Sequence, residues 1–493
     1  MKPCVWLWIC ACAQMALVWS AHSGNAQSLA ASIPRPSERQ LHWQRKELIM
    51  FLHFGVNTYT GREWGLGNEN PNIFQPVDLN TTQWVDAAKR AGFKEMILVV
   101  KHHDGFFLFP NPYTNHTVQY SSWRDYKGDV AADFVKSCHD LGMDPAFYLS
   151  PWDRNYYNMT WKPSYNAFYE KTEQWLVTHY GQFYELWWDG ANAVANRSVL
   201  YEWDKWLDIL RSSQPSAVGG GCGGTGGVFD CGPDTAWIGN EGGKAPETVW
   251  SWHTASIEFP TADKAPVYGP YFCDVSIRPG WFWHENQNNQ LKTLSQLVDI
   301  YFQSVGHNCN LQLNVPPNKS GLLQDGDVAR LLEFGEYISA MYETDFAAGG
   351  NATTSSAVAG HPGKAVVDPD VDTYWQTEAE DKDMTITLEL TGQANGADNS
   401  AAAPTVFNVV MLQEYLPEGQ RVAQHIVDIS NDGKGWTTVG LGTTIGNKRL
   451  YRLNADTAVP KMLRLRVMAT SGSVGSPAIS RFGLFKAGPL TEE

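Results

Sequence analysis

Between about residues 45 and 345 the sequence alternates short apolar runs with longer segments whose apolar residues recur at helical spacing. This alternation is typical of repeated β-α units around a parallel sheet, because each parallel strand is followed by a crossover helix. Eight runs predict strands, at residues 48–54, 96–102, 145–150, 185–189, 217–221, 248–252, 273–277 and 310–315. Helices are predicted at residues 82–91, 130–141, 165–180, 199–212 and 294–305. Eight strands close a (β/α)8 barrel, so the sequence predicts an α/β fold of this kind.

After a further predicted helix at residues 327–342, the chain becomes rich in Ala, Gly, Thr and Ser, and apolar residues recur at every second position. Strands are predicted at residues 384–390, 406–412, 425–430, 450–453 and 462–467, which favours an antiparallel β-sandwich. We therefore predict a catalytic barrel over residues 27–345 and a C-terminal sandwich over residues 346–493. The sandwich contains no cluster of catalytic residue types. It either binds carbohydrate or braces the barrel, and we favour bracing.

Residues 1–26 have one lysine, an apolar run over residues 5–19 and a polar end, the pattern of a cleaved secretory signal. We expect a secreted, extracellular protein. No later segment is apolar for long enough to cross a bilayer, so we expect no membrane partner. A net charge of -15 in a chain with 21 tryptophans argues against nucleic acid as a partner. The triplets for N-glycosylation are at Asn80, Asn115, Asn158, Asn196, Asn318 and Asn351.

Five cysteines follow the predicted signal, and an odd number cannot pair completely within one chain. Cys222 and Cys231 flank a Gly-rich loop and could form a disulfide in an oxidising compartment. Cys138 lies in a helical pattern and is expected to be a buried thiol. No cysteine spacing suggests a zinc site.

Polar and aromatic residues follow the first four predicted strands. In barrels of this type the reactive groups lie where the strands end at one face, so these residues should surround a common site. They are His53 with Glu63 and Trp64, then Lys101-His102-His103-Asp104, Trp152-Asp153-Arg154, and Trp187-Trp188-Asp189-Gly190. Indole faces cover the apolar side of a sugar ring while His and acidic groups bond its hydroxyls. The pattern therefore predicts a sugar site.

Cleavage of a glycosidic bond requires two carboxyl groups, one at the anomeric carbon and one that protonates the leaving oxygen. Asp189 fits the first role, since it ends a predicted strand and precedes a glycine that leaves room for substrate. For the second, Glu241 is favoured because glycines flank it and allow its loop to reach over the site. The candidates for this acid are Asp234, Glu241, Glu247, Glu258 and Glu285.

The chain resembles glycoside hydrolase family 29, the α-L-fucosidases, and most closely the plant-type branch that acts on α-1,3/1,4-linked fucose. The barrel segments that carry the resemblance are MFLHFGVNTYTGREWG, LVVKHHDGF, YLSPWDRN, LWWDGA, GPDTAWIGNEGG, CDVSIRPGWFWH and GHNCNLQLNVPPNKSGLL. It extends to the sandwich through FNVVMLQEYLPEGQRVAQ and GTTIGNKRL.

By matching position, the resemblance implies that Asp189 is the nucleophile and Glu241 the acid/base. It implies fucose-binding roles for His53, Glu63, Trp64, His102, His103, Tyr148 and Trp281. The implied mechanism is double displacement with retention, which places the two carboxyl groups about 5–5.5 Å apart. No metal or cofactor is implied, and the expected partner is a fucosylated oligosaccharide or glycan. This chain departs from the family pattern at Tyr271-Phe272, where relatives have an acidic residue.

Other interpretations of these residues stay open. An isolated Asp-Gly pair more often caps a turn than performs catalysis, and His102-His103 could be a metal pair, although we favour binding of hydroxyls. A transfucosidase would use the same site, whereas a lectin-like protein would have lost catalysis. The presence of both carboxyl groups argues against the lectin-like alternative.

Overall fold

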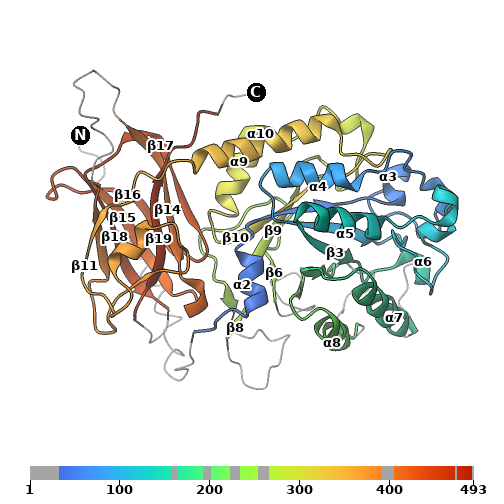
Figure 1. The fold of residues 1–493 in the computed structure, drawn as a ribbon, viewed down its shortest axis with the longest axis horizontal. Helices are drawn as coiled ribbons and strands as arrows, with labels where there is room; N and C mark the ends of the chain where they lie inside the picture. Colours follow the sequence, from blue (N-terminus) through green and yellow to red (C-terminus); the bar gives the residue numbers. More distant parts are fainter. Residues whose placement is uncertain are drawn as a thin grey trace, which may run out of the picture.

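The computed structural model describes residues 33–157, 164–191, 201–221, 234–253, 266–390, 405–471 and 475–490. Its largest sheet has eight parallel strands in the order β5-β4-β3-β2-β1-β10-β9-β6, which makes a nearly closed barrel. The strands are β1 (Leu48–Leu52), β2 (Glu95–Lys101), β3 (Asp144–Leu149), β4 (Glu185–Trp187), β5 (Val218–Gly220), β6 (Ala236–Trp237), β9 (Tyr271–Ser276) and β10 (Cys309–Asn314). The barrel lies on one side of the molecule and the C-terminal sheets on the other (Figure 1). The predicted fold class is confirmed.

Asp234 bridges the gap between β5 and β6. Its backbone N–H donates to the carbonyl of Gly219 at 3.3 Å, and its carboxylate accepts the N–H of Gly219 at 2.8 Å. Arg39 and Arg211 also bind this carboxylate, which is almost fully buried. Asp234 therefore closes the barrel, and it does not line the pocket described below.

The helices around the barrel begin and end within a few residues of the predicted bounds. They are α4 (Thr81–Arg90), α5 (Val130–Leu141), α7 (Ser164–His179), α8 (Trp203–Ser213), α9 (Leu294–Gln303) and α10 (Asp325–Met341). The short helices α2 (Glu38–Gln44), α3 (Val56–Thr60) and α6 (Arg154–Tyr157) were not predicted. Helix α5 shows why such bounds can be predicted. The Asp129 side chain caps its first turn at Ala132, and Gly142 ends it in the left-handed conformation.

The predicted sixth strand at residues 248–252 is wrong. The strand that pairs with β9 is β6, only two residues long, with Ala236 opposite Tyr271. Of this run only Val249 and Ser251 are buried. Their backbone bonds go to the C-terminal region, where Val249 N–H donates to Thr444 and Ser251 N–H donates to Gln420. The end of the run forms a separate two-stranded sheet of β7 (Trp252–His253) and β8 (Val267–Tyr268).

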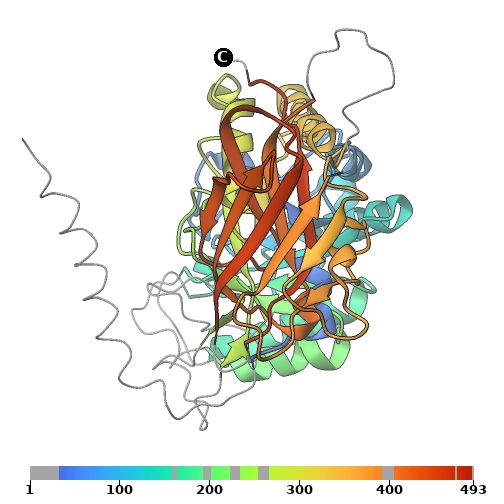
Figure 2. The same ribbon diagram turned by 90° about the vertical axis from the view of Figure 1, so that its left-hand side faces the viewer.

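The C-terminal region contains two antiparallel sheets, seen in front of the barrel in Figure 2. One contains β11 (Asn351–Thr354), β13 (Thr385–Glu389), β18 (Met462–Thr470), β15 (Val422–Ser430) and β16 (Thr437–Gly442). The other contains β12 (Trp375–Gln376), β19 (Ala478–Phe485), β14 (Val406–Glu414) and β17 (Arg449–Ala458). Trp375, Phe407 and Phe482 are fully buried in their shared core.

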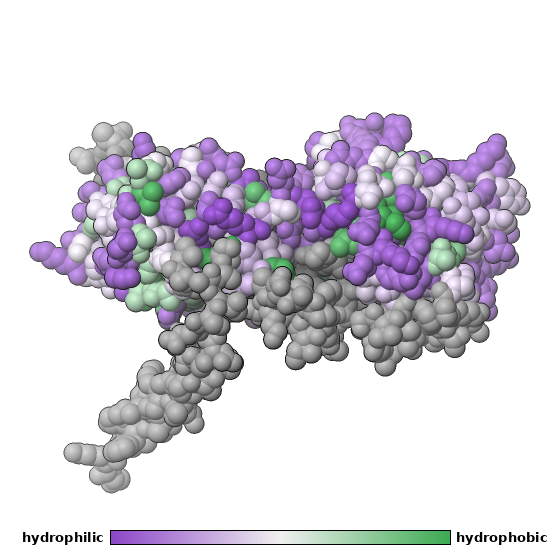
Figure 3. Space-filling view, turned by 90° about the horizontal axis from the view of Figure 1, so that it is seen from below, coloured by the Kyte–Doolittle hydropathy of each residue, from purple (hydrophilic) through white to green (hydrophobic). Residues whose placement is uncertain are grey.

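Short 3-10 helices occur in the connections of both regions. They are η1 (Pro71–Ile73), η2 (Val118–Tyr120), η3 (Trp123–Tyr126), η4 (Glu285–Gln287), η5 (Gly363–Val367) and η6 (Leu416–Glu418). The surface of the described residues that is visible from below is mainly hydrophilic, with small scattered apolar patches (Figure 3). No helix in the described ranges is both long and apolar enough to span a membrane.

A polar network joins the barrel to the C-terminal sheets. Asn308, just before β10, accepts the N–H of Asn447 at 2.7 Å and donates to Gln420 at 3.2 Å. Lys448 forms an ion pair with Glu47 at 2.5 Å. These contacts fix the sheets against the barrel and agree with a bracing role for the C-terminal region.

One disulfide joins two adjacent barrel strands, between Cys273 on β9 and Cys309 on β10. This pair was not predicted. The predicted pair, Cys222 and Cys231, lies outside the described residues. Cys138 is a free and buried thiol, as expected.

Candidate active site

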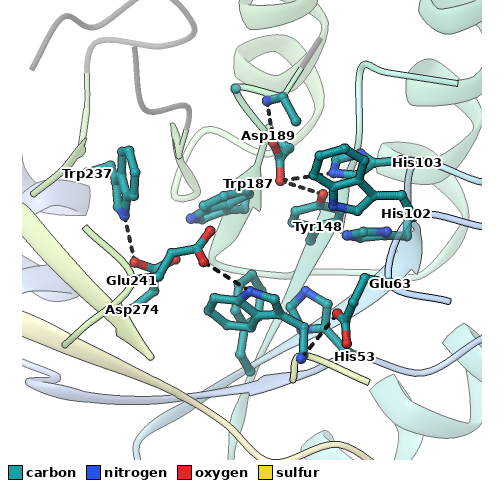
Figure 4. A pocket seen from close by; sticks show the side chains of 15 residues that line it. His53, Glu63, His102, His103, Tyr148, Trp187, Asp189, Trp237, Glu241 and Asp274 are labelled. Carbon is teal, nitrogen blue, oxygen red and sulfur yellow. Dashed lines mark hydrogen bonds and ion pairs between the residues drawn. The ribbon is translucent and has the colours of Figure 1, made fainter. Parts of the chain in front are cut away.

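A pocket opens at the carboxyl ends of the barrel strands (Figure 4). Every residue that the resemblance assigns a catalytic or fucose-binding role contributes to its lining: His53, Glu63, Trp64, His102, His103, Tyr148, Asp189, Glu241 and Trp281. Of the other strand-end residues expected to surround the site, Trp187 and Gly190 line the pocket, whereas Lys101, Asp104, Trp152, Asp153, Arg154 and Trp188 do not. Phe51, Ala191, Trp237 and Asp274 also line it and were not predicted. Strand ends and loops that are far apart in the sequence thus meet at one rim.

Asp189 follows β4 directly and enters the pocket as a carboxyl group with ordered partners. The hydroxyl of Tyr148 donates to its Oδ2 at 2.7 Å, and the backbone N–H of Ala191 donates to its Oδ1. His103 Nε2 lies 3.9 Å from the same Oδ2. Only a fifth of the side chain is exposed. These contacts fix the direction of the carboxylate, which is the requirement for a nucleophile that attacks one carbon atom.

His53 follows β1 and is held by the end of β10. Its Nδ1 lies 2.9 Å from Asn314 Oδ1, while the Asn314 amide donates to the carbonyl of Trp281 at 2.8 Å. Burial lowers the pKa of His53 to about 4. The imidazole is therefore neutral at neutral pH. Because Asn314 Oδ1 accepts the proton of Nδ1, His53 Nε2 is left to accept a hydrogen bond from a sugar hydroxyl.

His102 and His103 both reach the pocket although they are adjacent in sequence. Side chains alternate between faces only within a strand. β2 ends at Lys101, and the pair belongs to a turn in which the N–H of Gly105 donates to the carbonyl of His102. Their ring centroids lie 3.9 Å apart. Ser150 binds His103 Nδ1 at 2.8 Å, whereas His102 Nδ1 is buried without a partner among the described residues.

Burial lowers the pKa of both residues, that of His103 to about 4. Two neutral imidazoles suit the binding of hydroxyl groups. Within the described ranges, no group of three or more His, Cys, Asp or Glu residues could hold a metal ion.

Aromatic side chains form the walls. Trp187 stacks on Tyr148 with centroids 4.9 Å apart and is nearly buried. Trp64 is 56% exposed at the rim, where it packs edge-on against Trp152. The pocket therefore combines apolar faces with polar edges, as a pyranose ring requires.

Glu63 and Trp281 are linked on the side of the pocket where Glu241 enters. The backbone N–H of Trp281 donates to Glu63 Oε2 at 3.2 Å, and His284 lies 3.6 Å from the same carboxyl group. Burial raises the pKa of Glu63, although the contacts with Trp281 and His284 act to lower it. Glu63 thus positions the Trp281 loop and also lines the pocket.

Glu241 extends from the loop after β6, and the Trp281 indole donates to its Oε2 at 3.3 Å. Other candidates for the acid lie elsewhere: Asp234 closes the barrel, Glu247 is exposed beside Arg449, and Glu285 is in η4. Glu258 lies outside the described residues. Of the candidates that the structure describes, only Glu241 lines the pocket.

Asp274 is a fourth carboxyl group in the pocket, beside those of Asp189, Glu241 and Glu63. It lies within β9, and the Trp237 indole donates to its Oδ1 at 2.6 Å. Burial raises the pKa of Asp274 to about 7, with smaller contributions from Glu241 and Asp189. Inspection of strand ends missed it because β9 continues for two residues beyond it. The signal in the sequence is an Asp inside the buried strand segment Cys273 to Ser276.

Comparison with known proteins finds a matching family and several similar chains. The model of the alpha-L-fucosidase family matches residues 19–343. The chain is 38% identical over 470 residues to alpha-L-fucosidase 1 of Arabidopsis thaliana, covering 92% of this chain and 88% of the relative. It also resembles the solved structure of SpGH29, with a TM-score of 0.81 and 32% identity over 94% of this chain and all of the other. A Ruminococcus gnavus fucosidase of glycoside hydrolase family 29, solved in complex with fucose, gives a TM-score of 0.79 at 29% identity over 94% of this chain and 98% of the other.

Proposed function

This chain belongs to the α-L-fucosidase family, glycoside hydrolase family 29, and on that premise we propose that it removes terminal α-1,3/1,4-linked L-fucose with retention of configuration. α-L-Fucosidase activity follows from the family and from the curated relative. The stereochemical course, the linkage and the residue roles are our proposal.

Asp189 is the proposed nucleophile. Its carboxylate attacks the anomeric carbon while the bond to the leaving oxygen breaks, and Glu241 gives its proton to that oxygen. The product of this step is a β-fucosyl ester of Asp189 and a free acceptor hydroxyl. Glu241, now ionised, takes a proton from water, which attacks the same carbon and releases α-L-fucose. Each of the two steps inverts the configuration at the anomeric carbon, so the released fucose has the configuration of the substrate.

The observation that carries the proposal is the pair of differently held carboxyl groups. Asp189 is fixed by Tyr148 and by the backbone of Ala191, as a nucleophile needs. Glu241 is exposed and bonded to one indole, so it can reach a leaving group at the pocket mouth. Neutral His53, His102 and His103 are placed to bond the hydroxyls of fucose.

The test is hydrolysis of aryl α-L-fucosides by wild type, Asp189→Ala and Glu241→Ala, with and without azide. We expect both variants to lose about 10²–10⁴-fold in turnover of a substrate with a poor leaving group. Azide should restore Glu241→Ala and give α-fucosyl azide, because azide needs no general base to attack the β-fucosyl ester from the opposite face. With Asp189→Ala, azide takes the place of the missing carboxylate and should give β-fucosyl azide. A β-fucosyl azide from Glu241→Ala, or near-normal turnover by this variant, would contradict the assigned roles.

Linkage choice is tested with fucosylated oligosaccharides that differ only in the linkage. We expect α-1,3- and α-1,4-fucosyl substrates to be cleaved in preference to α-1,2 and α-1,6 isomers. Fucosyl transfer to an added sugar at the expense of hydrolysis would identify the chain as a transfucosidase. Fucose binding without turnover of any substrate would favour a lectin-like protein.

We also propose that the protein is secreted after cleavage near residue 26 and that it is N-glycosylated. Asn80, Asn115 and Asn351 are exposed, which agrees with glycan attachment. Amino-terminal sequencing of protein from the medium, and a mass shift on enzymatic deglycosylation, test the proposal. An intracellular protein with its first residues intact would contradict it.

A further inference from the structure

Both ends of the loop that carries Glu241 are hydrogen-bonded to the same residue, Asp274. Trp237 precedes this loop, residues 238–243, and its indole N–H donates to the Asp274 carboxyl at 2.6 Å. The loop ends at Gly243, whose backbone N–H donates to the Asp274 carbonyl at 3.0 Å. Asp274 thus contacts the chain on either side of Glu241 through two different groups.

The backbone at Gly243 leaves no room for a side chain. Gly243 has a φ of +69°, and a Cβ there would lie 2.7 Å from Val275 and 2.9 Å from Ile300. Between the two attachments, Asn240 accepts the N–H of Gly242 at 3.0 Å and donates to the carbonyl of Lys244 at 2.9 Å. The loop is therefore short, internally bonded and held against β9.

We propose that Asp274 is a positioning residue: it clamps the Glu241 loop at both ends and so holds the acid/base at the leaving-group oxygen. The inference rests on the proposed role of Glu241 as acid/base. Figure 4 shows the arrangement, with Trp237 bonded to Asp274 on the side of the pocket where Glu241 enters. Asp274 itself is 5% exposed and offers little surface to a substrate.

A hydrogen bond to Trp237 does not depend on the ionisation of Asp274, since a carboxyl and a carboxylate both offer an accepting oxygen. An Asn side chain offers the same acceptor through its amide oxygen. Substitution by Asn should therefore preserve the clamp, whereas Ala should release Trp237. This difference separates positioning from proton donation, because an Asn cannot supply the proton.

The experiment compares kcat/KM for two substrates. A nitrophenyl fucoside has a leaving group that departs without protonation, whereas a phenyl fucoside needs the acid. For Asp274→Ala we expect a loss of about 10–100-fold with the phenyl substrate and less than about 3-fold with the nitrophenyl substrate. Trp237→Phe keeps the ring, loses the N–H and should show the same split. Asp274→Asn should stay within about 3-fold of wild type on both.

Asp144→Ala is the matched control. It removes a strand carboxyl group at the opposite end of the barrel, where Asp144 interacts with Lys46 and His42. Any loss of stability there should affect both substrates equally, and thermal unfolding of every variant is measured alongside.

Four outcomes would overturn the inference. Equal losses on both substrates for Asp274→Ala would mean a general structural effect. An Asp274→Asn variant as impaired as Asp274→Ala on the phenyl substrate would make Asp274 the proton donor. Glu241→Ala is run in parallel: if it shows the leaving-group dependence and Asp274→Ala does not, only the clamp fails. If Glu241→Ala shows no such dependence, the assignment of Glu241 fails and the clamp with it.

Discussion

The buried ion pair between Arg278 and Asp327 allows a quantitative test of how the Trp281 loop is held. Arg278 Nε and Nη2 donate to the two Asp327 oxygens, each at 2.7 Å, and both side chains are fully buried. Arg278 also donates to the His284 carbonyl at 3.3 Å and to Asn288 at 3.0 Å. One guanidinium thus ties α10 to the loop that presents Trp281.

The pKa of Asp327 indicates how the energies balance. Burial raises this pKa, although the bonds and charge of Arg278 act to lower it. The free-energy cost of removing the carboxylate from water is therefore larger than the free energy gained from its attraction to the guanidinium. In such a pair, removal of one partner is costly, while replacement of both by apolar side chains is close to neutral.

Asp327→Leu should lower the free energy of unfolding by about 3–5 kcal/mol, because Arg278 cannot lose its charge and is left buried without a counter-charge. Arg278→Met should cost less, about 1–3 kcal/mol, since Asp327 can take up a proton. The double variant should unfold within about 1 kcal/mol of wild type. The coupling energy of the cycle is then on the order of 3 kcal/mol or more.

Urea unfolding at pH 7, followed by tryptophan fluorescence, measures these differences. The double variant should still show a raised KM for aryl fucosides, because the bonds from Arg278 to His284 and Asn288 are lost in it. Additive single losses in the double variant would refute the reasoning on desolvation. An Asp327→Leu variant as stable as wild type would show that Arg278 finds other partners.

Three further predictions concern stability. Burial lowers the pKa of His425 to about 4, whereas an unfolded imidazole titrates near 6.5. The neutral ring therefore stabilises the fold above about pH 6.5, and this stabilisation is lost as the pH falls toward 4. His425→Gln should lose less of its free energy of unfolding on acidification than wild type, and an unchanged slope would contradict this. The pKa of Asp274 is about 7 in the fold, so the free energy of unfolding falls as the pH rises from about 4 to 7. Asp274→Asn avoids this loss, and its free energy of unfolding relative to that of wild type should be about 2–4 kcal/mol more favourable at pH 8 than at pH 4. An equal difference between the two proteins at both pH values would count against this prediction. Replacing Cys273 and Cys309 together by Ala should cost about 2–4 kcal/mol in the free energy of unfolding, whereas reduction of the wild type without any loss would show that the bond contributes nothing.

The barrel could be predicted because most of its strands are buried on both faces. Strands such as β1 and β2 are buried at every position, so they are continuous apolar runs between polar segments. Strand β6 has two residues and cannot show any periodicity. The run at residues 248–252 has the composition of a strand, but its backbone N–H groups at Val249 and Ser251 bond to the C-terminal region and not to a barrel strand. Burial can be predicted from composition, whereas the partner that causes it cannot.

The pocket residues at strand ends could be predicted for a geometric reason. The carboxyl ends of parallel strands meet at one rim, so His53, His102, His103 and Asp189 had to lie near one another once the barrel was assumed. Trp187 belongs to the same strand-end motif as Asp189. Trp237 was missed because β6, which ends at this residue, has only two residues and was not predicted. Asp274 was missed because it lies inside β9 and not at its end.

The choice among acid candidates is a question of a different kind. Asp189 is placed by a strand, so its position follows from the fold, whereas Glu241 is placed by a loop whose path depends on Asp274 and Trp281. A nucleophile that attacks one carbon needs a fixed direction, and an acid that serves different leaving groups needs reach. Substitutions around β9 and the Trp281 loop should therefore impair protonation of the leaving group before they impair attack at the anomeric carbon, and the two aryl fucosides distinguish these steps.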